Sequence, residues 1–324
     1  MSRQRKKPRN RIDGWLVLDK PVGLSSNDAL TRIKKIFHPE KVGHAGTLDP
    51  LASGCLPLAF GEATKTVPFA MDGRKVYRFT VRWGIETATD DTEGETVAVS
   101  DVRPDAAEIE AVLPEFTGTI SQVPPIFSAI KVEGARAYDL ARSGEAVELE
   151  ARPVDIHRLW LVECPNADEA VFEVECGKGT YVRALARDLG RRLGTCGHVT
   201  ALRRLLVGPF AEEDMIPLET LEDLGQCAPG MGLDEAHASV ILPVATALDD
   251  IPALAVSRQD AARLRNGQGV LLRGRDAPAF KGLVSVTAHG ELVALGEIER
   301  GELRPRRVFN IAPVMTGATV IERN

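Results

Sequence analysis

The segment KVYRFTVRWG, residues 75–84, alternates polar and apolar side chains and thereby restricts the structures that this chain can form. In an extended strand, the mainly aromatic face would consist of Tyr77, Phe79, Val81 and Trp83. The opposite face would consist of Val76, Arg78, Thr80 and Arg82. A period of two indicates a strand with one buried face, and such strands are typical of antiparallel sheets.

Other apolar or alternating runs predict further strands, and amphipathic runs with capping residues predict helices. The expected strands are residues 14–21, 54–61, 96–100, 155–164, 170–176, 199–210, 283–299 and 306–311. The expected helices are residues 25–37, 62–71, 105–116, 135–144, 180–194, 218–225 and 257–267. Because strands and helices do not alternate regularly, we predict an α+β fold with a mixed, mainly antiparallel sheet.

The length of 324 residues suggests about two domains. Residues 1–10 are rich in Lys and Arg, and we expect a disordered basic tail there. We expect one large domain over residues 11–230, a linker over 231–246, and a small β-rich domain over 247–324. The tail is either merely solvated or makes a salt-sensitive contact with phosphate groups.

Composition excludes several classes of function. The five cysteines are scattered and never spaced as C-x-x-C, so we expect no disulfide framework and no metal site, and a reducing cytoplasm fits best. Residues 176–181, CGKGTY, lack the spacing of a nucleotide-binding loop, and no other cofactor motif is present. No apolar run approaches transmembrane length. The formal net charge of -6 does not exclude nucleic acid, because binding depends on local patches.

Residues 41–54, KVGHAGTLDPLASG, are too rich in glycine for a helix and too irregular for a strand, so we predict a loop. At its centre, Asp49 precedes Pro50. Asp-Pro commonly opens a turn, and this is the simplest structural interpretation of the aspartate. A carboxylate on a loop of this kind is also a candidate catalytic group, because glycines let the backbone approach a substrate closely.

Several motifs together identify a family. GHAGTLDPLASG with LPLAFGEATK closely resembles the active-site segment of the bacterial tRNA pseudouridine 55 synthases, the TruB family. LDKPVGLSSNDAL, KVYRFTVRWGIETATDDTEG, GKGTYVRALARDLG and HVTALRRLLVGPF resemble further segments of that family, in the matching order. The resemblance covers about residues 11–220. More loosely, the C-terminal region resembles the PUA domain of the family.

The resemblance implies a pseudouridine-synthase fold and the isomerisation of one uridine in the T-loop of tRNA, without a metal or organic cofactor. It assigns Asp49 as the catalytic aspartate, Arg183 as the arginine that pairs with it, and Tyr77 as the residue that stacks on the flipped base. From the residues alone, Tyr77 could be a core aromatic, and Arg183 could belong to a solvated face with Arg187 and Arg191. We expect those last two arginines to be phosphate contacts.

The resemblance also implies substrate-binding roles for Lys20, His44, Gly46, Lys178 and Leu202. Simpler interpretations stand beside these roles. A lone histidine in a loop is often merely exposed, a lysine often makes a surface salt bridge, and a leucine in a strand often belongs to the core.

Two alternative functions differ from that of a standalone tRNA enzyme. One is that of the guide-RNA-dependent relatives, which share the aspartate segment and work within a multi-protein particle. The other is that of an RNA-binding or RNA-folding protein in which catalysis is incidental. We expect a monomer that acts on the T-arm and elbow of tRNA, with no obligatory protein partner and no membrane association.

Overall fold

The computed structural model describes residues 9–127, 131–132, 135–136, 149–226, 239–272 and 281–311. Its centre is a nine-stranded sheet whose main path runs in the order β13-β1-β3-β12-β4-β11-β10-β7, with β2 paired to β3. These strands are β1 (Gly14–Lys20), β2 (Val42–His44), β3 (Ala52–Phe60), β4 (Lys75–Trp83), β7 (Gly118–Gln122), β10 (Arg152–Asn166), β11 (Glu169–Cys176), β12 (Gly197–Val207) and β13 (Ile216–Pro217). Among the described strand pairs of this sheet, only β1–β13 and β12–β3 are parallel, which confirms the mixed, mainly antiparallel prediction.

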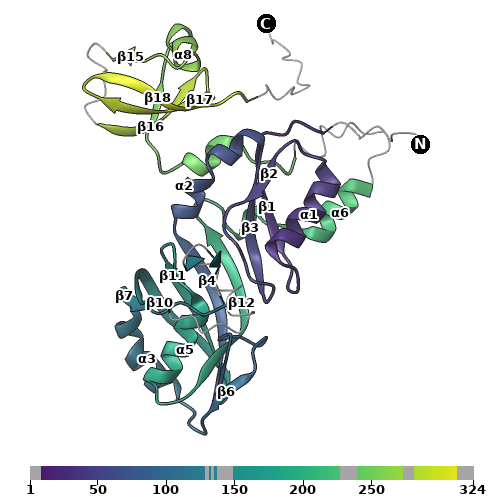
Figure 1. Cartoon of the computed structure of the whole chain (residues 1–324), viewed down its shortest axis with the longest axis vertical. Helices are drawn as coiled ribbons and strands as arrows, with labels where there is room; N and C mark the ends of the chain where they lie inside the picture. Colours follow the sequence, from purple (N-terminus) through teal and green to yellow (C-terminus); the bar gives the residue numbers. More distant parts are fainter. Residues whose placement is uncertain are drawn as a thin grey trace, which may run out of the picture.

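Strand β4 lies near the middle of this sheet, between β12 and β11 (Figure 1). Phe79 and Trp83 are buried on its apolar face, whereas Arg78 and Arg82 are exposed on the other. Phe79 stacks on Phe172 of β11 with ring centroids 5.4 Å apart. The predicted alternation is therefore confirmed, and one face of the strand builds the main hydrophobic core.

Helices cover the sheet at several points. They are α1 (Ser26–Phe37), η1 (Gly61–Lys65), α2 (Val67–Asp72), α3 (Ala106–Val112), η2 (Leu113–Phe116), α5 (Val182–Arg192), η3 (Glu212–Asp214) and α6 (Leu218–Gln226). α1 begins where the Ser25 side chain accepts a hydrogen bond from the Asp28 backbone N–H, as expected for an N-cap. The helix expected over residues 135–144 falls largely outside the described residues. In the part of the chain that the structure covers, no helix is long and apolar enough to cross a membrane.

The glycine-rich segment 41–54 is less irregular than predicted. Its first residues form β2, which pairs with the end of β3, and β3 itself begins at Ala52. The loop is thus confined to residues 45–51. Hydrogen bonding to a neighbouring strand outweighs the low strand propensity of glycine, because strand formation depends strongly on context.

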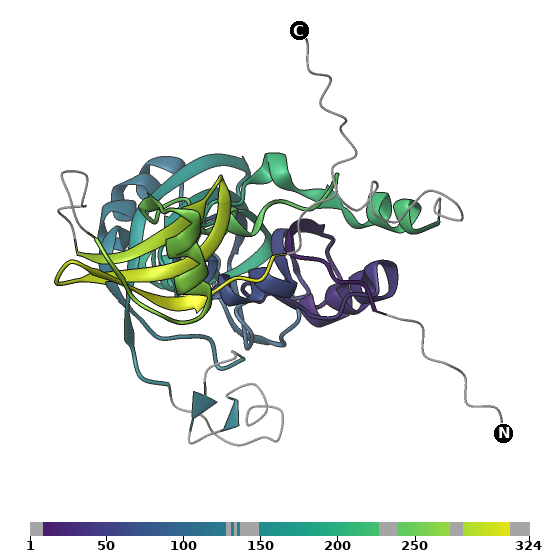
Figure 2. The same ribbon diagram turned by 90° about the horizontal axis from the view of Figure 1, so that it is seen from above.

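A second, five-stranded sheet lies at one end of the molecule (Figures 1 and 2). It contains β14 (Ala253–Ala255), β15 (Val270–Leu271), β16 (Gly282–Ala288), β17 (Glu291–Glu299) and β18 (Glu302–Val308), and helix α8 (Arg258–Arg265) packs on it. This sheet has a core of its own. A shared apolar cluster that includes Trp15, Phe210 and Phe309 joins it to the larger sheet, and Lys65 Nζ donates a hydrogen bond to the Val308 carbonyl across the contact.

Three smaller elements complete the chain. The hairpin of β5 (Ile85–Thr87) and β6 (Thr96–Val99) follows β4, and the turn 87–91 leads from the end of β5 into the loop that joins the two strands. Strands β8 (Lys131–Val132) and β9 (Ala135–Arg136) form a separate pair. Helix η4 (Val244–Leu248) lies between the two sheets in sequence and packs in the shared apolar cluster.

Candidate active site

The loop 45–51 is held by hydrogen bonds to its backbone. The buried Ser26 hydroxyl donates to the Leu48 carbonyl at 2.9 Å and accepts from the Leu48 N–H at 2.8 Å. The Gly23 N–H donates to the Pro50 carbonyl at 2.8 Å. Since both neighbours of Asp49 are tied to the start of α1, the position of its carboxylate is fixed relative to that helix.

Arg204 of β12 supports the same loop from inside the protein. Its side chain is buried, and Nε donates to the Cys55 carbonyl at 2.7 Å. Its two terminal nitrogens donate to the carbonyls of Gly46 at 3.1 Å and Thr47 at 3.4 Å. The guanidinium fork suits several acceptors at once. One side chain therefore connects the first part of the loop to strand β3, which follows the loop.

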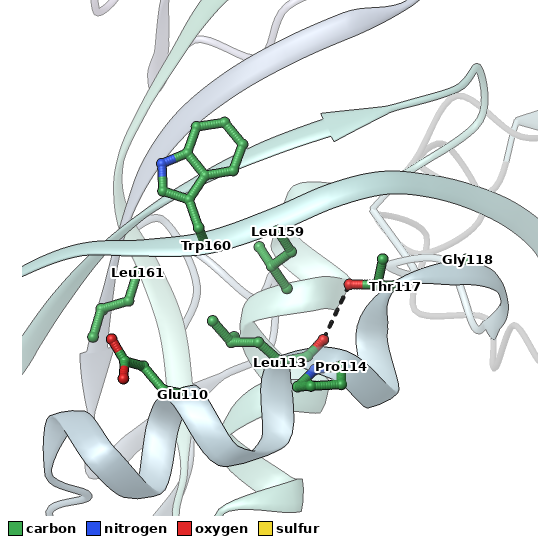
Figure 3. Close-up of a pocket in the computed structure, with 8 residues that line it drawn as sticks. All are labelled: Glu110, Leu113, Pro114, Thr117, Gly118, Leu159, Trp160 and Leu161. Atoms are coloured by element: carbon green, nitrogen blue, oxygen red, sulfur yellow. Dashed lines mark hydrogen bonds between the residues drawn. The ribbon is translucent and has the colours of Figure 1, made fainter.

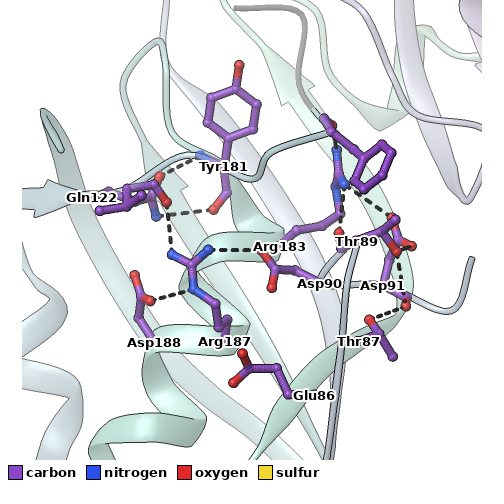
Figure 4. Close-up of polar contacts among 12 residues, drawn as sticks. Glu86, Thr87, Thr89, Asp90, Asp91, Gln122, Tyr181, Arg183, Arg187 and Asp188 are labelled. Carbon is purple, nitrogen blue, oxygen red and sulfur yellow. Dashed lines mark hydrogen bonds and ion pairs between the residues drawn. The ribbon is translucent and has the colours of Figure 1, made fainter. Parts of the chain in front are cut away.

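Arg183 connects the loop to helix α5 and to the turn after β5. Its Nη2 lies 3.0 Å from Asp49 Oδ2, and its Nη1 lies 3.3 Å from Asp91 Oδ2. The same two nitrogens donate to the carbonyls of Phe127 at 2.9 Å and Thr89 at 2.8 Å. Figure 4 shows the contacts of Arg183 with the turn 87–91. Arg183 thus bridges two carboxylates from segments that are far apart in sequence.

The three charges differ in their access to solvent. The side chains of Arg183 and Asp91 are 7% and 5% exposed, but that of Asp49 is 41% exposed. Arg183 is in the first turn of α5, where the helix dipole disfavours a cation, and the two carboxylates offset that cost. Asp49 is therefore the member of this group that an incoming substrate can reach.

Tyr77 and Lys20 lie within electrostatic reach of Asp49. Tyr77 is half-buried opposite Arg204 in the β4–β12 register. Burial raises the pKa of its phenol, and the charge of Arg204 opposes this. Lys20 is fully buried, and its Nζ donates to the Pro21 and Leu24 carbonyls at 2.9 and 2.6 Å. Burial lowers the pKa of Lys20 to about 8, although the charge of Asp49 raises it.

Gly46 lies within the loop 45–51, and His44 and Leu202 lie next to it. His44 ends β2, and its buried Nδ1 has no hydrogen-bond partner in the structure. Burial and the charges of Arg204 and Lys34 lower the pKa of its imidazole, which is neutral at pH 7. Gly46 has φ of +97°, which favours glycine. Leu202 is buried in the main core, where its register partners are on β4 and β3.

Two residues that we expected to contact RNA, Lys178 and Arg187, form ion pairs within the protein. Lys178 pairs with Asp72 at 2.9 Å, where both side chains are largely exposed, so the structure does not connect it to the Asp49 group. The phosphate contact expected for Arg187 is wrong, because its side chain is buried and paired with Asp90 at 3.0 Å. The turn 87–91 and residues 122–127 cover the helix face that would otherwise be solvated. Arg191, one turn further, is exposed and pairs with Glu86.

Sequence reasoning missed Asp91, Arg204 and Tyr181. Asp91 belongs to a polar stretch that is typical of a surface turn. Arg203 and Arg204 are adjacent in an apolar strand, and successive strand residues face opposite sides of a sheet, so this pair of residues is the signal for one buried cation. Tyr181 precedes α5, and its backbone exchanges two hydrogen bonds with Gln122, at 2.9 and 3.2 Å. Its ring points away from both arginines of the helix (Figure 4).

The structure also has an open apolar hollow at the β10–β7 edge of the sheet (Figure 3). Its lining residues are Glu110, Leu113, Pro114, Thr117, Gly118, Leu159, Trp160 and Leu161. None of them belongs to the group around Asp49, so we do not assign the chemistry to this hollow. Across the described ranges, no group of three or more His, Cys, Asp or Glu side chains could hold a metal ion.

The group around Asp49 provides defined chemical capabilities. A partly exposed carboxylate next to a buried guanidinium can act as a nucleophile or as a base. The half-buried aromatic ring of Tyr77 can stack on a planar base. Such a site suits chemistry on a nucleotide that has left its stack.

Comparisons with known proteins agree with this chemistry. Residues 34–182 match the model for the N-terminal domain of the TruB family of pseudouridylate synthases. Residues 183–249 and 252–309 match two models for C-terminal domains of the same family. The chain is 61% identical to a tRNA pseudouridine synthase B from Bradyrhizobium diazoefficiens, over 99% of this chain and 92% of that protein. It is 57% identical to one from Agrobacterium fabrum, over 94% of this chain and 98% of that protein.

Two solved structures with similar folds are complexes of several components. One is a Cbf5–Nop10–Gar1 complex, with 29% identity and a TM-score of 0.71 over 91% of this chain and 84% of that chain. Another is an H/ACA particle bound to a substrate RNA that contains 2′-deoxyuridine, with 27% identity, a TM-score of 0.71 and the same coverage. Because the much higher identities are to synthase B proteins and the family models match most of the chain, this protein belongs to the TruB family of pseudouridylate synthases.

Proposed function

We propose that this chain isomerises uridine 55 in the T-loop of tRNA to pseudouridine, with Asp49, Tyr77 and Arg183 as the residues that carry the reaction. The observation that carries this assignment is the 3.0 Å contact between Arg183 and the accessible carboxylate of Asp49. The high identity to proteins named tRNA pseudouridine synthase B supports tRNA as the substrate.

The reaction breaks the bond between N1 of uracil and C1′ of the ribose, and forms a bond between C5 and C1′. N1 gains a proton and C5 loses one, so no external reactant is needed. The uridine must first leave its stack, at a cost of a few kcal/mol. Asp49 either attacks C1′ or C6, or acts as a base on the sugar; its geometry is compatible with each.

Arg183 orients the carboxylate of Asp49 through their 3.0 Å contact. Tyr77 stacks on the flipped base, for which only its ring face is needed. Lys20, His44, Gly46 and Leu202 shape the surrounding pocket for the nucleotide. Lys178 contacts RNA outside that pocket, since its only ion pair in the described structure is an exposed one that RNA can displace.

We assign residues 11–230 to a catalytic domain, 231–246 to a linker and 247–324 to a PUA-like RNA-binding domain, after a basic tail at 1–10. The separate core of the second sheet supports that division. The PUA-like domain would contact the RNA backbone and set its register. The enzyme would act as a monomer in the cytoplasm, without an obligatory protein partner.

A guide-dependent activity is the second candidate, because two solved structures of similar fold are an H/ACA particle and a Cbf5–Nop10–Gar1 complex. To separate the two, the purified chain alone is incubated with an unmodified tRNA transcript. Pseudouridine is mapped by carbodiimide adducts and primer extension. We expect one stop in the T-loop at position 55, and none in a transcript with cytidine there. Modification that requires an added guide RNA would contradict the proposal.

A further inference from the structure

Helix α5 presents two buried arginines to two consecutive aspartates. Arg183 and Arg187 are one turn apart on the same face of the helix. Arg183 lies 3.3 Å from Asp91, and Arg187 lies 3.0 Å from Asp90 (Figure 4). The Arg183–Asp91 pair belongs to the group around Asp49, whereas the Arg187–Asp90 pair lies outside that group.

Arg187 is fully occupied inside the protein. Besides Asp90, its Nε contacts Asp188 Oδ1 at 2.9 Å and its Nη2 donates to the Val123 carbonyl at 2.8 Å. Its residue exposure is only 8%. With all three nitrogens engaged and little surface, Arg187 cannot bind RNA without losing these contacts. Its effect on catalysis must therefore pass through its partners.

Asp90 sets the path of the turn 87–91. Its φ of +58° is in the left-handed region, which aspartate and asparagine tolerate better than most residues. Its carbonyl accepts from the Val199 N–H at 3.0 Å, and its N–H donates to the Thr87 carbonyl at 3.1 Å. This conformation lets two consecutive side chains, those of Asp90 and Asp91, reach the same helix.

The same two arginines also hold one further segment. Arg187 binds the carbonyl of Val123, and Arg183 binds that of Phe127. The turn 87–91 and residues 122–127 are thus both attached to α5 at two points, one turn apart. Loss of the Arg187 contacts would therefore tilt both segments. This would shift the Thr89 and Phe127 carbonyls and the Asp91 carboxylate, which orient Arg183.

We propose that Arg187 and Asp90 form a positioning pair, which holds the turn 87–91 so that Asp91 keeps Arg183 directed at Asp49. This inference rests on the proposed roles of Asp49 and Arg183. The pair touches neither substrate nor reacting atoms, and it acts through Asp91 and Arg183.

Ionisation of Asp90 gives the pair a measurable signature. Burial raises the pKa of Asp90 to about 6, although the charges of Arg187 and Arg183 lower it. The titratable and charged groups on the elements packed against it are Arg183, Arg187 and Asp188 on α5, Glu86 on β5 and His198 on β12. The charged form of Asp90 is therefore less favourable in the folded protein than in water, and the carboxyl takes up a proton near pH 6. Above pH 6 the pair is ionic, and below pH 6 it weakens.

The test uses Asp90→Asn, because asparagine is close in shape to the protonated acid and tolerates the left-handed backbone. We expect the melting temperature at pH 7.5 to stay the same or to rise. The single-turnover rate on a T-arm transcript should fall by about tenfold to a hundredfold, while the RNA dissociation constant changes less than twofold. Wild type should lose rate below pH 6 through a titration that the variant lacks.

Arg187→Met should slow the reaction to a similar extent, and Arg187→Lys, which keeps the charge, should recover part of the rate. The double variant should be no slower than the slower single variant, because the two residues act as one unit. Arg192→Met, at the end of the same helix and exposed where Arg192 pairs with Glu115, is the matched control and should stay within twofold of wild type.

Two failures can be told apart. If wild type is inactive or Asp49→Asn is active, the proposed function is wrong. If those two behave as expected but Asp90→Asn reacts at the wild-type rate, or shows the wild-type pH profile, the positioning pair is refuted. A rate that falls only as much as RNA binding falls would also refute it.

Discussion

Arg204 is the residue whose removal should most affect the loop 45–51. It is 2% exposed, and within the described part of the chain no carboxylate lies within ion-pair distance of it. Its charge is instead balanced by the carbonyls of Cys55, Gly46 and Thr47, at 2.7, 3.1 and 3.4 Å. Replacement by methionine keeps much of the side-chain volume and removes all three hydrogen bonds.

The cost of Arg204→Met follows from these distances. A hydrogen bond to a charged group contributes about 1.5–3 kcal/mol, and two of the three contacts are short enough to count fully. Loss of the buried charge also relieves Lys20, whose pKa Arg204 lowers. We therefore expect a net destabilisation of about 3–4 kcal/mol, near the lower end of that sum. For a domain of this size, this corresponds to a decrease in melting temperature of roughly 10 °C.

Arg203→Met is the control for this change, because residue 203 is next in the strand and faces the other side of the sheet. Its contacts with Asp19 and Glu212 are partly exposed, so its loss should cost at most about 1 kcal/mol. Both variants are measured by thermal unfolding and by single-turnover rate. Equal melting temperatures and equal rates for the two variants would refute the role of Arg204 in holding the loop.

Three further predictions concern other parts of the site. Tyr77→Phe should bind T-arm RNA better than Tyr77→Ala in a filter-binding assay, because stacking needs only the ring; equal affinities would refute stacking. Because burial lowers the pKa of Lys20 from 10.5 to about 8, the unfolded chain binds more protons than the folded one between those pH values. Stability of wild type relative to Lys20→Met should therefore rise with pH from 8 to 10.5, by up to ~3 kcal/mol in urea unfolding; no relative gain would contradict the shift. Gly54→Ala should destabilise far more than Gly23→Ala in the same assay. Both have positive φ, but a Cβ at Gly54 would lie 2.3 Å from the Arg204 carbonyl, whereas nothing lies within 4 Å at Gly23; similar losses would contradict that steric account.

Much of the fold could be predicted because it depends on local pattern. The alternation in β4 identified its buried face correctly, and the helix expected over residues 25–37 corresponds to α1. β2 was missed because its short strand is formed by pairing with β3, and a segment of Val-Gly-His carries almost no propensity of its own.

The site shows where sequence reasoning reaches its limit. Arg183, Arg187 and Arg191 recur every four residues, a spacing that a solvated helix face and a buried ion-pair layer share. Only the folded chain shows that Asp90 and Asp91, nearly a hundred residues earlier, cover the first two. Burial of a charge depends on partners distant in sequence, so no local pattern could distinguish these positions.

The central claim is that Asp49 carries the isomerisation. Its most direct test uses an unmodified T-arm transcript with tritium at C5 of uracil, since the reaction releases the C5 hydrogen to water. Tritium release and RNA binding are measured for wild type and for Asp49→Asn. We predict release by wild type alone, with binding by both proteins. Release by Asp49→Asn at the wild-type rate, or none from wild type that binds the RNA, would contradict the claim.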